Sequence, residues 1–204
     1  EGLDLNSTLE RVGERLREVL DVKAIAIVAY DPQAGLAISN YVYHYGRRII
    51  PQQFSMSNYK YSMRLALKVG SKPLVVNTDV ERYWKKFGTD ILTEWTEIPK
   101  AFVIVPMLAG RELVGSITIA DYEDENAFIN LPINLLETIA SNMGTAIQNV
   151  RLFDETQRLL KETEQRATEL QIINNIGQTL TEGGDLENMI QRVGERIQEA
   201  LNIN

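Results

Sequence analysis

The sequence AFVIVPML (101–108), AGR (109–111) and ELVGSITIAD (112–121) decides the fold of this chain. Its two outer segments are dominated by valine, isoleucine and other apolar residues, a composition typical of buried strands. Gly110 permits the positive φ that a tight turn often requires. We therefore predict an antiparallel hairpin, with strands over 101–108 and 112–121.

A second hairpin is predicted nearer the N-terminus. Residues 23–30 (KAIAIVAY) read as an apolar strand, and the turn at 31–35 contains a proline and a glycine, which favour the backbone angles of turns. Residues 36–46 follow as the return strand. Alternation along that strand places three tyrosines on one face: Tyr41, Tyr43 and Tyr45.

Helices and shorter elements complete the expected order. An amphipathic helix over 5–20 precedes the first strand, because its apolar residues recur at helical spacing. A long helix begins near Pro132, whose missing N–H suits a first-turn position, and continues to about 180. The remaining expected elements are a short helix over 58–69, a brief strand over 73–76 and an irregular, partly helical segment over 79–98. This order predicts an α+β fold, a mainly antiparallel sheet flanked by helices.

The composition excludes several classes of function. The chain has 204 residues and a net charge of −7, which argues against a nucleic-acid-binding surface. It has no cysteine, which excludes disulfides, thiolate metal sites and thiol nucleophiles, and its single histidine is His44. No apolar run approaches the roughly 18 residues of a membrane-spanning helix. A cytoplasmic location is the simplest expectation.

Residues 4–20 and 185–201 read almost the same. Both contain Arg-Val-Gly-Glu-Arg, at 11–15 and 192–196, and both begin with Asp-Leu. Shared amphipathicity would align the apolar positions, but it would not reproduce these charged residues and the glycine in register. We interpret the pair as a long-period repeat whose second copy is cut off after its first helix. The chain is therefore expected to be part of a larger protein, with any effector outside it.

Several motifs of this chain resemble those of one family of sensor modules. They are AIVAYD at 26–31, GSKPLVVN at 70–77, IVPM at 104–107, GRELVGSI at 110–117 and AIQNVRLF at 146–153. Together they resemble the GAF domain family over residues 4–153. The resemblance implies a central antiparallel sheet with a long C-terminal signalling helix. It also implies tandem domains joined by helices, as in sensor kinases and nucleotide cyclases.

The resemblance and the repeat together divide the chain into three parts. Residues 1–150 are expected to be a GAF-like sensor domain, and 151–184 a linker or coiled-coil helix. Residues 185–204 are expected to be the first helix of a truncated second GAF-like repeat. The implied function is that of a regulatory, small-molecule-sensing module in a larger signalling protein, not that of an enzyme.

The chain lacks residues that several branches of the GAF family use. Covalent bilin attachment and methionine sulfoxide reduction both need cysteine, which is absent. The cyclic-nucleotide branch carries an Asn-Lys pair, a phenylalanine and an Asp-Glu pair, of which only Phe128 has a counterpart here. A haem ligand would have to be His44, which lies among tyrosines on a predicted strand and is interpreted as a packed or surface histidine. Neither haem nor cyclic nucleotide is therefore expected, and the small molecule stays unnamed.

The resemblance places a ligand site between the sheet and the segment 79–98. Aromatic side chains are frequent in this segment, and they suit a mostly apolar pocket with a few polar groups. The candidate pocket residues are Arg64, Tyr83, Trp84, Phe87, Trp95 and Thr118. The same composition also fits a lid that fills its own cavity, and both interpretations stay open. No metal site is expected, because the acidic residues at 121–125 are interpreted as a solvated loop.

The long helix exceeds the length that one small domain can cover. At 1.5 Å per residue, 132–180 would extend roughly 70 Å. One stripe of the helix can pack on the sheet, and a second stripe repeats every seven residues through Leu152, Leu159, Ile173 and Leu180. This step is typical of a coiled coil, although threonine, asparagine and arginine at other positions weaken it. We predict a parallel homodimer through this helix, with a single solvated helix as the alternative.

Three classes of function remain open from the sequence. The first is a sensor module that dimerises through its helices, and the second is a scaffold whose GAF domain binds no ligand and only holds a dimer in register. The third, an enzyme, is disfavoured because no phosphate-binding loop, nucleophile elbow or thiol is present. A small molecule bound under the aromatic segment would favour the sensor over the scaffold.

Overall fold

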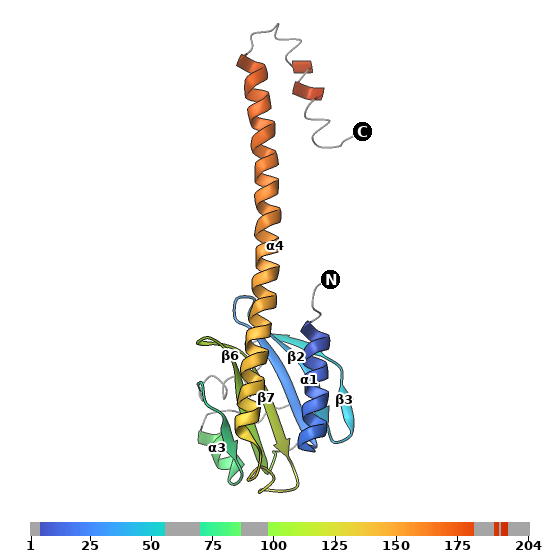
Figure 1. The fold of residues 1–204 in the computed structure, drawn as a ribbon, viewed down its shortest axis with the longest axis vertical. Helices are drawn as coiled ribbons and strands as arrows, with labels where there is room; N and C mark the ends of the chain where they lie inside the picture. Colours follow the sequence, from blue (N-terminus) through green and yellow to red (C-terminus); the bar gives the residue numbers. More distant parts are fainter. Residues whose placement is uncertain (1–4, 56–69, 87–97, 182–189, 192, 196–204) are drawn as a thin grey trace. The chain divides into compact units, whose positions relative to one another are not determined.

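A computed structural model of the chain describes residues 5–55, 70–86, 98–181, 190–191 and 193–195. The chain divides into two compact units, Glu1–Arg151 and Leu152–Asn204. All the described strands belong to the first unit (Figure 1).

The first unit is built on one antiparallel sheet. Its strands lie in the order β3-β2-β1-β7-β6-β5, and β4 also pairs with β2. The central strands are therefore β1 and β7, one from each predicted hairpin. The strand bounds are β1 Ala24–Asp31, β2 Leu36–His44, β3 Arg47–Ile49, β4 Gln52–Ser55, β5 Leu74–Val76, β6 Ala101–Ala109 and β7 Glu112–Asp121.

The hairpin of β6 and β7 forms as predicted. Its register runs from Ala101 opposite Asp121 to the turn at Gly110, which has a φ of +63°. A register shift between Met107 and Leu108 marks a β-bulge near the turn. The apolar runs of the sequence thus become two adjacent strands inside the sheet, and the predicted α+β fold class is confirmed.

The described helices are α1 Leu5–Leu20, α3 Val80–Lys86 and α4 Ile133–Thr181. The first and last confirm the predicted amphipathic and long helices. Pro132 precedes α4, and its carbonyl oxygen accepts the backbone N–H of Leu136 at 3.2 Å. No helix in the described part of the chain is long and apolar enough to cross a membrane.

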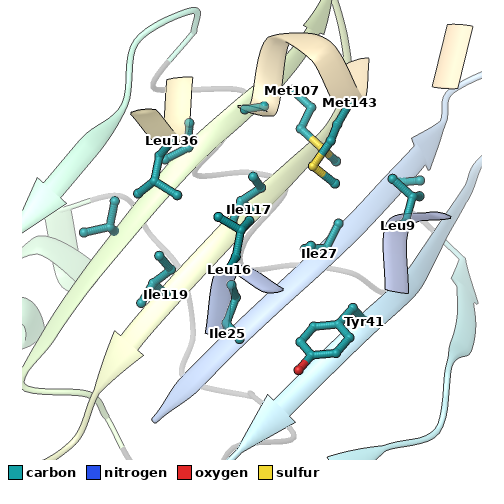
Figure 2. Close-up of a cluster of buried hydrophobic side chains, with 14 of the residues drawn as sticks. Leu9, Leu16, Ile25, Ile27, Tyr41, Met107, Ile117, Ile119, Leu136 and Met143 are labelled. Carbon is teal, nitrogen blue, oxygen red and sulfur yellow. The ribbon is translucent and has the colours of Figure 1, made fainter. Parts of the chain in front are cut away.

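The main core lies on the face of the sheet that α1 and the N-terminal part of α4 cover, which we call the helix-covered face (Figure 2). Alternate residues of the central strands point to this face, and a stripe of each helix packs on them. The stripe predicted for the long helix is confirmed in these contacts. The core includes Leu9, Leu16, Ile25, Ile27, Tyr41, Met107, Ile117, Ile119, Leu136, Ala140, Met143 and Ile147.

Two glycines let the helices approach the sheet closely. A Cβ added to Gly13 of α1 would lie 2.4 Å from Cγ of Tyr41. A Cβ added to Gly144 of α4 would lie 2.3 Å from the carbonyl oxygen of Leu108. Protein interiors are close-packed, so neither position accepts a larger residue without displacement of the helix or its neighbour.

The return strand of the first hairpin differs from the prediction. β2 ends at His44 rather than at 46, and Tyr45 follows it with a φ of +43°. Tyr41 and Tyr43 share the helix-covered face as predicted, but Tyr45 lies beyond the strand. The short strands β3 and β4 were not predicted, because brief, largely polar segments carry no clear period-2 signal.

The middle of the chain confirms two shorter predictions. β5 corresponds to the strand predicted at 73–76, and α3 supplies the helical part of the segment 79–98. Residues 87–97 of that segment lie outside the described residues. The helix predicted over 58–69 lies outside them as well.

Candidate functional site

The candidate site lies on the opposite face of the sheet, which we call the second face. Apolar residues of β1, β2 and β6 form a second, smaller core cluster there, together with β5 and α3. The buried members of this cluster are Val28, Tyr30, Ala37, Val76, Val80, Phe102 and Ile104.

Three short side chains lie in the middle of the second face. Ala26 of β1 pairs with Thr118 of β7, and Ala120 lies two residues further along the same face. The neighbouring residues on β6 are larger and buried. Ala26, Thr118 and Ala120 themselves stay partly exposed. We call these three residues the small-residue patch.

Thr118 brings a polar atom into this patch. Its Oγ1 is buried and has no hydrogen-bond partner among the described residues. Buried hydroxyl groups are usually paired, because an unpaired one loses its hydrogen bonds to water without replacement. An unpaired Oγ1 beside two alanines is therefore suited to bind a polar group of a small molecule.

A second polar group of this face is already paired. The hydroxyls of Tyr30 and Ser116 lie 2.6 Å apart, and both residues are buried. Ser116 lies two residues before Thr118 on β7, so the two hydroxyls share one face of the strand. The Tyr30–Ser116 pair therefore fixes one border of the small-residue patch.

We expect Tyr30→Phe and Ser116→Ala each to lower the free energy of unfolding by about 1–3 kcal/mol, because each breaks the buried hydrogen bond between the two hydroxyls. The double variant should lose less than the sum of the two, since the same hydrogen bond is lost in both single variants. Urea denaturation of the four proteins measures this cycle. Strictly additive losses would show that the two hydroxyls do not interact.

The structure brings two of the predicted pocket residues to the same face. Tyr83 of α3 packs against the second-face cluster, and Thr118 lies in the small-residue patch. Trp84 belongs to α3, but its side chain is not among those described. The other three predicted residues, Arg64, Phe87 and Trp95, lie outside the described residues.

Sequence reasoning missed one polar candidate. Asn77 follows β5 directly, and its Oδ1 is buried without a hydrogen-bond partner among the described residues. β5 pairs with β6, whose Phe102 and Ile104 belong to the second-face cluster. The signal was present in the motif GSKPLVVN at 70–77, since an asparagine that ends a short apolar strand can present its amide beside the sheet.

His44 is a packed histidine, as the sequence indicated. Its ring makes edge-to-face contacts with Tyr45 and Tyr122, with centroids 5.1 Å and 5.2 Å away. The backbone N–H of Tyr122 also donates to the Tyr45 hydroxyl oxygen at 2.9 Å. Burial raises the pKa of the Tyr45 phenol. The three aromatic residues pack together where β2 and β7 end.

The acidic loop after β7 has a structural role. Asp121 accepts the backbone N–H groups of Glu123 and Asp124 at 2.7 Å and 2.8 Å. Glu123 forms an ion pair with Lys23 and is exposed. Within the described ranges, no three histidine, aspartate or glutamate side chains are grouped so that they could hold a metal ion.

Comparison with known families decides the classification of this fold. The family model described as "GAF domain" matches residues 2–148, which include the whole sheet, α1 and the N-terminal part of α4 that covers the main core. The chain belongs to the GAF domain family. No curated protein sequence matches it.

Solved structures share the GAF fold at low sequence identity. A methyl-accepting chemotaxis protein matches with a TM-score of 0.55 and 15% identity, over 73% of this chain and 90% of that one. The GAF domain of an Acinetobacter phosphoenolpyruvate-protein phosphotransferase gives 0.52 and 12%, over 76% and 89%. A red/green cyanobacteriochrome in its red light-absorbing state gives 0.51 and 16%, over 74% and 98%. At these identities the likeness concerns the fold alone.

Proposed function

We propose that this GAF domain is a regulatory, small-molecule-sensing module of a larger signalling protein, of the sensor kinase or nucleotide cyclase type. The observation that carries the proposal is the buried Oγ1 of Thr118 in the small-residue patch, which has no hydrogen-bond partner in the described ranges. The patch offers apolar contact with a single polar group, as small-molecule sites commonly do. Family membership and a chemotaxis protein among the structural neighbours support a sensory role.

Tyr30 connects the second face with α4 through two hydrogen bonds. Tyr30 pairs through its hydroxyl with Ser116 on the second face, and its backbone carbonyl oxygen accepts a hydrogen bond from Nη2 of Arg151. Arg151 lies on α4, after the last core residue of that helix, Ile147. A ligand that moves the Tyr30 side chain therefore also acts on the strand end to which Arg151 is bound.

The C-terminal part of α4 carries the features of a helical partner surface. Leu152, Leu159, Leu170 and Ile173 are all between 48% and 62% exposed within the chain. They lie on the stripe predicted to form a coiled-coil seam. We propose that two copies of the chain pair in parallel along this stripe, which we call the seam.

The polar threonines of the seam do not prevent two helices from packing together, because their hydroxyls are hydrogen-bonded within their own helix. The hydroxyl of Thr156 donates to the carbonyl oxygen of Leu152 at 2.6 Å, and that of Thr163 to Leu159 at 2.8 Å. These hydroxyls are satisfied inside their own helix, so they need no partner across the seam. Arg166 is likewise paired with Glu162 one turn earlier, at 2.6 Å. The seam is therefore weakly apolar and suited to small changes in packing.

A ligand-free scaffold is the second candidate, since the exposed seam alone would suffice to hold a dimer. In both cases we place any catalytic activity in an effector outside this chain. We also propose a cytoplasmic location, because a chain without cysteine cannot form the disulfides that stabilise proteins in oxidising compartments.

Native mass spectrometry distinguishes the sensor from the scaffold. We expect the 23.1 kDa chain, after incubation with a soluble metabolite extract and desalting, to retain a small molecule. Ala26→Leu should abolish the retained mass, because its larger side chain fills the small-residue patch. Ala34→Leu makes the same change at an exposed position of the β1–β2 turn and should keep it. If the parent chain is detected only at its own mass, with no retained molecule, the sensor function is excluded and the scaffold function remains.

A further inference from the structure

Two contacts fix α4 to backbone atoms of the sheet. A Cβ at Gly144 would lie 2.3 Å from the carbonyl oxygen of Leu108, so the helix backbone lies directly against β6 at this point. About two helical turns later, Nη2 of Arg151 donates to the carbonyl oxygen of Tyr30 on β1. Because both contacts are made to main-chain atoms, α4 is tied to the positions of two strands and not to the rotamers of their side chains. We call these contacts the Gly144 support and the Arg151 support.

The two supports lie on different strands that end at the same edge of the sheet. β1 and β6 each pair with β7 in antiparallel orientation, so they run in the same direction with β7 between them. Tyr30 and Leu108 are each the last residue but one of their strand. Neighbouring strands lie about 4.8 Å apart, so the supports bridge roughly 10 Å of sheet. If one support moves and the other stays in place, the helix must pivot rather than slide along its axis.

The small-residue patch lies over the strand of only one support. Ala26 belongs to β1, and Thr118 and Ala120 belong to the neighbouring β7, whereas β6 contributes no member. The same face of β1 is bound to β7 through the hydroxyls of Tyr30 and Ser116, 2.6 Å apart. A molecule bound on the patch therefore acts directly on β1, which carries the Arg151 support, and only through β7 on β6.

We propose that Arg151 is the positioning residue through which this domain steers α4. The Gly144 support is the pivot, and the Arg151 support moves with β1 when the small-residue patch is filled. The change that reaches Leu152, where the exposed seam begins, is a tilt of the helix. Arginine suits this role, because a hydrogen bond from a charged donor is stronger than one between neutral groups. The inference rests on the proposed function only in taking the patch as the place where a ligand acts.

Spin labels on two introduced cysteines measure the tilt without any ligand. The chain has no cysteine of its own, so Arg111→Cys in the β6–β7 turn and Asp154→Cys on α4 carry the only labels, both at exposed positions. Leu159→Asp and Ile173→Asp are included in every sample, so that the distance is measured within one chain and not across the proposed dimer. Ala26→Leu fills the patch in place of a ligand. We expect Ala26→Leu to shift the distance between the labels.

Substitutions of Arg151 test whether it carries that shift. Arg151→Ala should broaden the distance distribution and abolish the shift caused by Ala26→Leu. Arg151→Lys can still donate to the Tyr30 carbonyl oxygen and should restore at least part of the shift. Arg158→Ala is the matched control, because this guanidinium binds Glu155 of its own helix at 2.7 Å and 2.9 Å, and it should change neither quantity. A bond with only a structural role would lower the melting temperature when removed but leave the shift in place.

Two results would overturn the proposal. One is a shift that is equally large in the chain with Arg151 and in Arg151→Ala. The other is the absence of any shift when the patch is filled. Ala120→Leu fills the patch from β7 and decides the matter if Ala26→Leu does not fold. Native mass spectrometry tests the sensor function separately, so a retained molecule without a shift that depends on Arg151 would contradict this inference alone.

Discussion

Replacing Gly144 by alanine should lower the free energy of unfolding by about 2–3 kcal/mol, the upper part of the range of roughly 1–3 kcal/mol found for overpacked cores. The added Cβ would lie 2.3 Å from the carbonyl oxygen and 2.7 Å from the carbonyl carbon of Leu108. These are backbone atoms of β6 beside the register shift of the β6–β7 pair, and they cannot rotate away as a side chain could. α4 would have to move off the sheet and loosen Met143 and Ile147. Urea denaturation, followed by tyrosine and tryptophan fluorescence, measures the loss.

Gly177→Ala is the matched control on the same helix. A Cβ there would meet nothing within 4 Å in the described structure, so measured at a concentration at which the chain is monomeric, the variant should show the gain in helix propensity of up to about 1 kcal/mol. The two substitutions should therefore differ in sign. Equal effects at Gly144 and Gly177 would mean that α4 does not rest on the Leu108 backbone.

The double variant Leu159→Asp with Ile173→Asp should dissociate the proposed dimer. Both side chains are exposed in the single chain, 48% and 62%, and would be buried between helices in the pair. Burial of unpaired carboxylates is strongly unfavourable, so the dissociation constant should rise at least about 1000-fold, which corresponds to roughly 4 kcal/mol. Light scattering should report twice the 23.1 kDa chain mass for the parent and a single chain mass for the variant.

Gln157→Asp with Gln171→Asp adds the same two charges to the opposite, exposed side of α4 and should leave the dimer intact. Circular dichroism should show an unchanged sheet in both variants, because the core of the first unit lies N-terminal to these positions. A parent chain that stays monomeric at tens of micromolar would contradict the pairing itself.

The fold could be predicted because its strongest signals are local. Two apolar runs around Gly110 specify the β6–β7 hairpin, and helical periodicity specifies α1 and α4. The close approach of helix to sheet was not predictable, because it depends on which residue lies opposite a glycine in space. Gly13 reads in sequence as a weak point of a helix, yet in the structure it rests on Tyr41. The turn after β2 was placed too late, although Gly46 lies in it with a φ of +86°, because its first residue is Tyr45, a residue type that rarely adopts the left-handed backbone it has here.

The candidate site could be predicted only in part. Thr118 was chosen as a polar residue on a central strand, and Tyr83 as an aromatic one of the segment 79–98; the structure places both on the second face. Thr118 is a candidate binding residue because its Oγ1 has no partner among the described residues and because alanines lie beside it. Which residues lie beside it depends on the cross-strand register. The Tyr30–Ser116 pair and Asn77 were missed, because hydrogen bonds between distant residues leave no local pattern in the sequence.

Disulfide cross-linking tests most directly whether the second face controls the pairing of α4. The chain has no cysteine, so a single introduced cysteine reports on one position. Leu159→Cys on the seam should cross-link between copies at least about tenfold faster than Lys161→Cys on the opposite side of the helix, as expected for a parallel seam. The rate at 159 should change when the metabolite extract is added, and Ala26→Leu should abolish that change. Equal cross-linking rates at 159 and 161 would contradict the proposed seam. A rate at 159 that does not change when the extract is added would contradict control of the pairing by the second face.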